Sequence, residues 1–214
     1  MTSCCRARPV EQMFRPETAR QNLESYRKKG LGALSRRMVE AAVHGGLEDA
    51  RVLDIGGGIG AVQAELLERG ADTGEIAELV SSYEGPALEL AREKGLEGRV
   101  SYRVADILET PGAVGPADVV MMNRVVCCSP DGLALAAAAA RLTRRTLVLS
   151  FPRDVFWARA GVRFLNAWLW LMRRSFRTFV HPTAKLLAAA EGEGLHLVER
   201  GNDAFWEFAA LSRQ

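Results

Sequence analysis

The sequence predicts an α/β fold built on a doubly wound, mostly parallel sheet. Short apolar runs alternate with helical patterns along most of the 214 residues, which is typical of parallel strands joined by helices. The first apolar run, residues 51–55, leads directly into a glycine-rich loop. Near the C-terminus, two strand-like runs at 195–201 and 204–212 are separated by Asn202 and Asp203, which predicts a hairpin. With 48% hydrophobic residues, the chain can bury the core of one ordinary domain.

The remaining elements are predicted from their periodicity. Helices are expected over residues 16–29 and 34–43, separated by a break at Gly30, Leu31 and Gly32. Further strands are expected over residues 75–80, 100–104, 118–122 and 146–151. Further helices are expected over residues 61–69, 85–94, 133–142, 155–174 and 182–193. We interpret residues 1–33 as an N-terminal helical lid and residues 34–214 as a single domain with a helical cap inserted at about 155–181.

The loop after the first strand carries an acid and four glycines: Asp54, Gly56, Gly57, Gly58 and Gly60. Glycines let a backbone turn sharply and approach a ligand closely. The spacing Asp-x-Gly-x-Gly-x-Gly differs from the dinucleotide fingerprint, which has two residues before its last glycine. It resembles the first motif of the class I S-adenosylmethionine-dependent methyltransferases.

This resemblance covers roughly residues 34–214 in the order of the elements. It implies a Rossmann-like, seven-stranded sheet in which one strand of the C-terminal hairpin inserts antiparallel. It also implies that S-adenosylmethionine binds at the carboxyl ends of the strands and leaves as S-adenosylhomocysteine. In that reading Asp54 and the glycine loop cradle the methionine portion; alternatively, Asp54 only orders the loop by accepting its amide hydrogens.

The resemblance further implies a carboxylate at the end of the second strand, because one carboxylate can accept hydrogen bonds from both ribose hydroxyls. Glu78, eighteen residues after Gly60, is the favoured candidate, and Glu84 and Ser82 compete with it. Past the third strand, Asp106 matches the position that accepts a hydrogen bond from the adenine amino group, with Ile107 against the ring. An Asp after a strand is also a common turn former.

The segment MMNRVVCCSPD, residues 121–131, is similar in pattern to small bacterial methyltransferases related to the magnesium-protoporphyrin O-methyltransferases. The family pattern places Asn123 and Arg124 beside the methionine end of the cofactor. Arg124 is either a partner for a substrate carboxylate or a scaffold arginine. We interpret Cys127 and Cys128 as packing residues, because methyl transfer from a sulfonium needs no enzyme nucleophile.

A general base is needed only if the methyl acceptor must lose a proton. His181, between the fifth strand and the next helix, is the candidate that its position favours, although a His before Pro is often a capping or turn residue. Asp154, with Arg153 as its ion-pair partner, is the second candidate. In the lid, Phe14 and Tyr26 either reach the cofactor or anchor an amphipathic helix.

The predicted helix over residues 155–174 interleaves aromatic residues with arginines, and its aromatic residues include Trp157, Phe164, Trp168 and Trp170. We interpret it as a cap over the cofactor cleft. A peripheral membrane contact or a pocket for a flat hydrophobic substrate are the alternatives. Arg159 and Arg163 interrupt the apolar stretch, which argues against a membrane span.

Charge and cysteine content disfavour several classes of function. The formal net charge of +2 gives no global basic field, which disfavours a nucleic-acid substrate. The cysteines form two adjacent pairs, Cys4-Cys5 and Cys127-Cys128, which do not suit a metal site or an unstrained disulfide. Without an apolar signal core at residues 1–10, we expect a cytoplasmic protein with reduced thiols.

The sequence thus predicts a methyltransferase that uses S-adenosylmethionine on a small, apolar or aromatic acceptor, with oxygen as the preferred acceptor atom. An RNA methyltransferase is one alternative, with a basic face built from Lys28, Lys29, Arg36 and Arg37. A regulatory or partner-stabilising protein that binds the cofactor without catalysis is the other.

Overall fold

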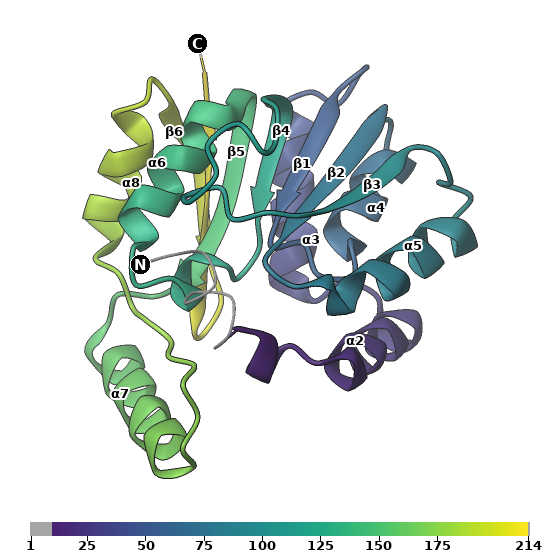
Figure 1. Ribbon diagram of the computed structural model, residues 1–214. Helices are drawn as coiled ribbons and strands as arrows, with labels where there is room; N and C mark the ends of the chain where they lie inside the picture. The colour runs from purple at the N-terminus through teal and green to yellow at the C-terminus, as the bar shows by residue number, and fades with distance from the viewer. Residues whose placement is uncertain (1–9, 214) are drawn as a thin grey trace.

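A computed structural model describes residues 10–213, so Cys4 and Cys5 lie outside the described residues. The chain forms a seven-stranded sheet in the order β3-β2-β1-β4-β5-β7-β6 (Figure 1). Its strands are β1 (Arg51–Ile55), β2 (Thr73–Glu78), β3 (Val100–Val104), β4 (Ala117–Met122), β5 (Thr143–Pro152), β6 (His196–Asn202) and β7 (Trp206–Ser212).

The strand order confirms the predicted Rossmann-like fold. Strands β1 to β5 pair in parallel, whereas β7 pairs antiparallel with both β5 and β6. The strand order reverses between β1 and β4, and ligands of such sheets bind outside the carboxyl ends of the strands at this point. The topology therefore places a candidate site at the ends of β1 and β4.

Helices cover both faces of the sheet (Figure 1). Helices α3, α4 and α5 pack on one face, and α6 and α8 pack on the other. The described helices are α2 (Pro16–Lys29), α3 (Ala33–His44), α4 (Ala61–Glu68), α5 (Glu84–Glu93), α6 (Gly132–Leu142), α7 (Phe156–Leu171) and α8 (Thr183–Glu191), with short 3-10 turns η1 (Ser81–Tyr83) and η2 (Val126–Cys128).

Strands β1, β4, β5 and β7 contribute side chains to two hydrophobic cores, because successive residues of a strand point to opposite faces. In β1, Val52 packs into the core under α3 and α4, whereas Leu53 packs into the core under α6 and α8. In β4, Met121 packs into the first of these cores and Met122 into the second. Burial on both faces explains why these strands are almost continuously apolar in sequence.

Several element boundaries differ from the predicted ones by a few residues, and three of these differences have a local reason. Strand β2 ends at Glu78 rather than at residue 80, because the chain turns there into η1. Strand β7 begins at Trp206 rather than at residue 204, because Asp203 accepts hydrogen bonds from the backbone N–H of Phe205 and Trp206 and lengthens the hairpin turn. Helix α7 stops at Leu171 because Arg173 takes a left-handed conformation, with φ at +53°.

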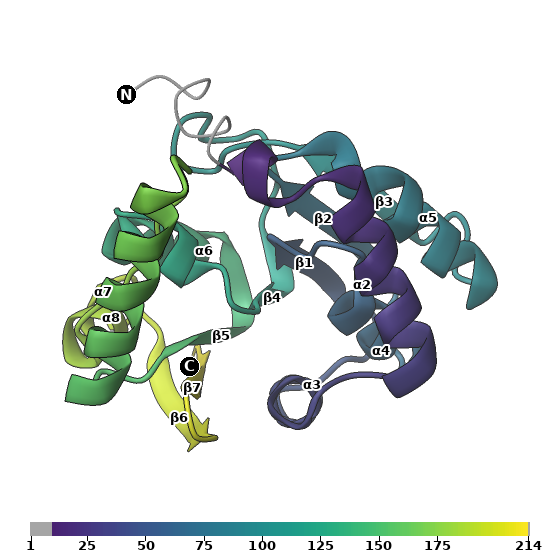
Figure 2. The same ribbon diagram turned by 90° about the horizontal axis from the view of Figure 1, so that it is seen from below.

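Helices α2 and α7 both lie beyond the same end of the strands (Figures 1 and 2). Helix α2 is on the side of β1 to β3, and α7 is on the side of β5 to β7. Helix α2 packs on α5 and η1, whereas α7 projects away from the sheet. No helix of residues 10–213 has the length and apolar character that crossing a bilayer requires.

Candidate functional site

A cavity of about 640 Å³ opens at the carboxyl ends of β1, β2 and β4. It is lined by the glycine loop, by the ends of these strands, by residues of α2 and by residues 175–179. Its volume lies within the range typical of small-molecule sites. The two parts of the predicted cap differ in their relation to the cavity. Its last residues, Ser175, Phe176, Arg177 and Phe179, line the cavity, whereas no residue of α7 is among the described lining residues. The expectation that α7 itself covers the cleft is therefore wrong.

The loop after β1 requires its glycines for steric reasons. Gly56 has a φ of +66°, and a Cβ on it would lie 2.5 Å from Cγ2 of Val125. A Cβ on Gly57 would lie 2.5 Å from Oδ2 of Asp54. The backbone of this loop therefore passes closer to Val125 and Asp54 than any other residue type allows.

Asp54 is the most unusual charged residue of the site. Its side chain is buried, with 1% of the residue exposed, and neither carboxylate oxygen has a hydrogen-bond partner of normal geometry within residues 10–213. Burial raises the pKa of Asp54 to about 8, the nearby Glu78 carboxylate adds to the rise, and the backbone N–H of Gln63 opposes it. A buried acid without a partner is costly for the fold alone, so it indicates a group that faces a ligand.

Glu78 is the only one of the three ribose candidates that the structure brings to the described cavity lining. Its Oε1 accepts a hydrogen bond of 2.9 Å from the N–H of Gly58, and its Oε2 accepts one of 3.0 Å from the N–H of Leu79. Burial raises the pKa of Glu78, and these two backbone donors limit the rise. Glu84 is exposed on α5, and the hydroxyl of Ser82 donates to the carbonyl of Phe14.

Asp106 and Ile107 lie side by side in the cavity wall after β3, and both are buried. Oδ1 of Asp106 accepts a hydrogen bond of 2.9 Å from the N–H of Leu108. Asp106 therefore closes a turn with one oxygen, as the alternative interpretation expects, while lining the cavity.

Asn123 and Arg124 line the cavity at the end of β4. The Asn123 amide is fixed on both sides, because it donates to Oγ of Ser35 at 3.0 Å and accepts from Oγ of Ser150 at 3.1 Å. Arg124 has a φ of +62°, and its guanidinium carbon lies 5.1 Å from the ring centroid of Trp206.

The lid side of the cavity contains both residues expected there and two that sequence reasoning missed. Phe14 and Tyr26 line the cavity, and the Tyr26 hydroxyl donates to Glu65 at 2.9 Å, so this hydroxyl is directed to α4. Tyr83 and Asn22 were not predicted; Nδ2 of Asn22 donates to the Tyr83 hydroxyl at 2.8 Å. Tyr83 follows Glu78 by five residues, but no motif marks an aromatic residue at that position.

The opposite side of the cavity was also missed in part. Phe176 meets Phe14 edge to face, with ring centroids 6.0 Å apart, and Arg177 lies beside it in the lining. Residues 175–179 are distant in sequence from every cofactor motif. Only the fold brings them to the site.

His181 does not reach the described cavity lining. Its ring is buried, and Nε2 lies 3.2 Å from the carbonyl oxygen of Val126 and 3.0 Å from that of Ser129. Because carbonyls only accept hydrogen bonds, Nε2 carries the proton and donates to them. Gly132 leaves room for the ring, because a Cβ there would collide with it. The position of His181 thus supports the turn role rather than that of a general base.

Asp154 lies outside the described cavity lining as well. Its Oδ1 accepts a hydrogen bond of 2.5 Å from Nε of Arg159, which corrects the predicted pairing with Arg153. Arg153 instead donates to the carbonyl of Ala204 at 3.3 Å.

Of the cysteine pair, Cys128 is in the described cavity lining and Cys127 is buried behind it. The Cys127 and Cys128 sulfurs are 3.9 Å apart, and both approach the carbonyl oxygen of Arg124. Interaction with the Cys127 sulfur raises the pKa of Cys128, and burial adds to the rise, so the cysteine that lines the cavity remains a thiol. The basic residues considered for RNA binding, Lys28, Lys29, Arg36 and Arg37, are not in the described lining.

Comparison with known proteins agrees with this geometry. Residues 53–150 match the methyltransferase domain family. No curated protein matches the sequence. Magnesium protoporphyrin IX methyltransferase from Synechocystis PCC 6803, solved with bound S-adenosylhomocysteine, superposes with a TM-score of 0.69 at 21% identity, over 85% of this chain and 82% of that one.

Two further solved structures are similar. An O-methyltransferase family 2 protein from Planctomyces limnophilus DSM 3776, in complex with apigenin, has a TM-score of 0.69 at 16% identity, over 94% of this chain and 62% of that one. The N-methyltransferase NodS from Bradyrhizobium japonicum WM9, in complex with S-adenosylhomocysteine, has a TM-score of 0.61 at 17% identity, over 84% of this chain and 85% of that one.

The sheet order, the antiparallel β7 and the glycine loop after β1 define the class I methyltransferase fold. Residues 53–150 match a methyltransferase domain, and the chain as a whole has the fold of the class I methyltransferases.

The raised pKa of Asp54 predicts a pH-dependent stability. With a folded pKa of about 8, Asp54 keeps a proton that the unfolded chain releases above its ordinary value of 3.8. The free energy of unfolding should therefore fall as the pH rises between about 4 and about 8. Asp54→Asn removes this contribution, so urea denaturation at about pH 5 and about pH 9 should show wild type losing more stability than the variant. An equal loss in both proteins would contradict the buried, protonated acid.

The contacts of His181 predict a structural effect of its removal. His181→Ala removes the donor shared by the carbonyl oxygens of Val126 and Ser129, of which only that of Val126 keeps a backbone donor, the N–H of Ser129. We therefore expect the free energy of unfolding to fall by about 1–3 kcal/mol in urea denaturation. S-adenosylmethionine binding, measured by calorimetry, should be unchanged. His196→Ala, at an exposed position on β6, is the matched control and should alter neither quantity. Unchanged stability in His181→Ala would refute the turn role.

Proposed function

We propose that this enzyme binds S-adenosylmethionine in the cavity and transfers its methyl group to an oxygen of a small apolar or aromatic acceptor. The observation that carries the proposal is the division of the cavity lining. Its acids, Asp54, Glu78 and Asp106, come from the ends of β1, β2 and β3, whereas Arg124 and Arg177 come from the end of β4 and the segment after α7.

The acidic side suits an amino acid joined to a nucleoside. An ammonium group beside Asp54 would supply the partner that its carboxylate lacks and would favour the ionised form. The glycine loop and the N-terminus of α4 leave backbone space for the methionine carboxylate. Asn123, fixed by Ser35 and Ser150, completes this end of the cavity.

The nucleoside portion would lie along the ends of β2 and β3. Each oxygen of Glu78 already accepts one backbone N–H and retains a further lone pair, which allows the carboxylate to accept both ribose hydroxyls. Asp106 and Ile107 would hold the adenine by its amino group and its ring face. The ring of Tyr26 would cover the cofactor from the lid.

The acceptor would lie against Phe14, Phe176 and Phe179, which give the lid and the facing wall an apolar, aromatic lining. S-adenosylmethionine supplies a methyl group that is already activated on a sulfonium. The chain's own task is then to hold the acceptor oxygen close, aligned and shielded from water.

The basic side favours an acceptor that needs no general base. No histidine is in the described lining, and its acids lie at the cofactor end. A carboxylate acceptor is already deprotonated at neutral pH, and a guanidinium would hold it in place. We therefore place an aromatic or apolar carboxylate opposite Arg124 and Arg177, with a methyl ester as the product.

Glu78→Gln tests the cofactor site. The substitution keeps an oxygen for the Gly58 N–H but removes the charge, so S-adenosylmethionine affinity should fall about tenfold or more in calorimetry. Glu84→Gln, at the competing exposed position, is the matched control and should bind like wild type. No binding by wild type would overturn the proposed function, and an effect of Glu84→Gln alone would move the ribose site.

Arg124→Met tests the acceptor site. Aromatic carboxylic acids and their amides are offered with S-adenosylmethionine, and product masses are measured. We expect methyl esters from the acids only, and at least about a tenfold loss of kcat/KM in the variant with cofactor affinity retained. Arg36→Met, on α3 outside the described lining, is the control. Methylation of the amides alone would refute the carboxylate assignment.

A further inference from the structure

Helix α7 exposes an unusual amount of apolar surface. Phe164 is 74% exposed, Trp168 53%, Trp170 70% and Leu171 66%, and Phe156 and Met172 are also exposed. The buried residues of this helix are few: Ala158, Val162 and Leu169. A contiguous exposed patch of this kind marks an interaction surface in a soluble fold.

Four of the exposed apolar residues lie on one face of the helix, whereas Phe156 and Trp170 lie on the flank that carries Arg159 and Arg163. Trp157, Phe164, Trp168 and Leu171 recur at intervals of seven, four and three residues, which places them in one stripe. Gly161 lies in the same stripe, and the stripe contains no charged residue. Arg159 and Arg163 are four residues apart and lie on a flank of the helix, between this stripe and the buried residues.

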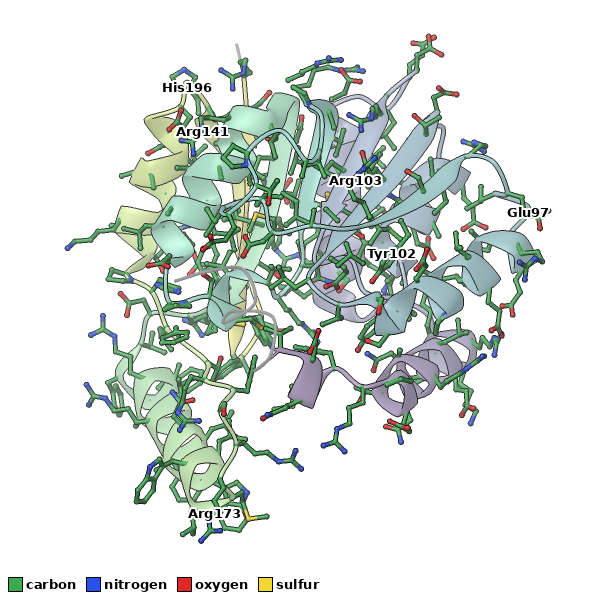
Figure 3. All side chains as sticks on the ribbon, viewed as in Figure 1. Glu97, Tyr102, Arg103, Arg141, Arg173 and His196 are labelled. Carbon is green, nitrogen blue, oxygen red and sulfur yellow. The ribbon has the colours of Figure 1, made fainter. Side chains whose placement is uncertain are left out.

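The charges around the stripe have one sign. Residues 155–181 contain no Asp or Glu and carry five arginines: Arg159, Arg163, Arg173, Arg174 and Arg177. Arg159 pairs with Asp154, and the other four form no ion pair among residues 10–213. Arg173 lies at the tip of α7, far from the sheet (Figure 3). The helix therefore presents an apolar stripe bordered by unneutralised positive charge.

The helix is also held in place in a way that keeps the stripe outside. The Asn166 side chain donates to the Thr178 carbonyl at 2.8 Å and accepts from the Thr178 N–H at 3.0 Å. At the other end, the Trp157 ring lies 6.1 Å from Phe205 in the β6–β7 turn. The stripe is thus formed before any partner binds, so docking needs no folding of α7.

We propose that α7 and the following residues to Arg174 dock on an anionic lipid bilayer, with the stripe in the interface and the arginines of this segment on the lipid head groups. Aromatic side chains flanked by arginines are the composition that such interfaces select. A second copy of this chain fits the stripe less well, because two such faces would bring four arginines against four with no acid between them. This proposal stands on α7 and does not depend on the identity of the methyl acceptor.

Vesicle flotation of the full chain tests the proposal. We expect flotation with vesicles of phosphatidylcholine mixed with phosphatidylglycerol, less with phosphatidylcholine alone, and less in high salt. Two double variants, Phe164→Ser with Trp168→Ser and Arg173→Glu with Arg174→Glu, should each weaken partitioning about tenfold or more. Fluorescence of the α7 tryptophans should shift to the blue on binding in wild type.

Matched controls separate docking from misfolding and from self-association. Leu88→Ser on α5 and Arg36→Glu on α3 change exposed residues of the same types elsewhere and should float like wild type. S-adenosylmethionine binding should be equal in all these variants, which shows that they are folded. If wild type itself does not bind S-adenosylmethionine, the proposed function is refuted, but the docking result remains valid. Wild type that does not float, or a dimer in light scattering that Trp168→Ser dissociates without any vesicle binding, would overturn the proposal.

Discussion

The site depends on the close contact between the Asp54 carboxylate and the backbone of the loop after β1. Gly57 passes so near to Oδ2 of Asp54 that a single methyl group between them would push the loop away. With the loop in this position, the N–H of Gly58 reaches Glu78 and joins the ends of β1 and β2. Gly56 in turn leaves room for Val125 at the end of β4. One steric fit therefore sets the relative positions of the three strand ends that form the cavity floor.

The cavity separates charge along the strand order. Carboxylates gather at the ends of β1 to β3, where burial works against their ionisation, as the raised pKa values of Asp54 and Glu78 show. Two arginines, Arg124 and Arg177, line the cavity on the side of β4 and residues 175–179. Such a separation orients a ligand that carries a cation at one end and an anion at the other, because the reversed orientation would set like charges together in a poorly solvated space.

The fold was predictable, and so were the residues that line the cavity at the ends of β1 to β3, because their signals are local. The glycine loop, the acid at the end of β2 and the order of strands are each encoded in a few neighbouring residues. The end of β2 brings Glu78 rather than Glu84 to the cavity lining, which sequence alone left open because the turn into η1 is a tertiary feature. His181 was misjudged for a related reason: chain position placed it near the site, but packing against η2 turned its ring toward backbone carbonyls. Phe176 and Tyr83 carry no sequence signal.

Phe14 and Phe176 belong to opposite sides of the cavity, and their edge-to-face contact joins the lid to the facing wall. An aromatic pair of this kind contributes about 0.5–1.5 kcal/mol, which is of the order of thermal energy. Phe14 is held on its own side by the hydrogen bond from Ser82 to its carbonyl, so its separation from Phe176 disturbs neither the sheet nor η1. We therefore expect the two sides of the cavity to separate at this contact without any unfolding of α2.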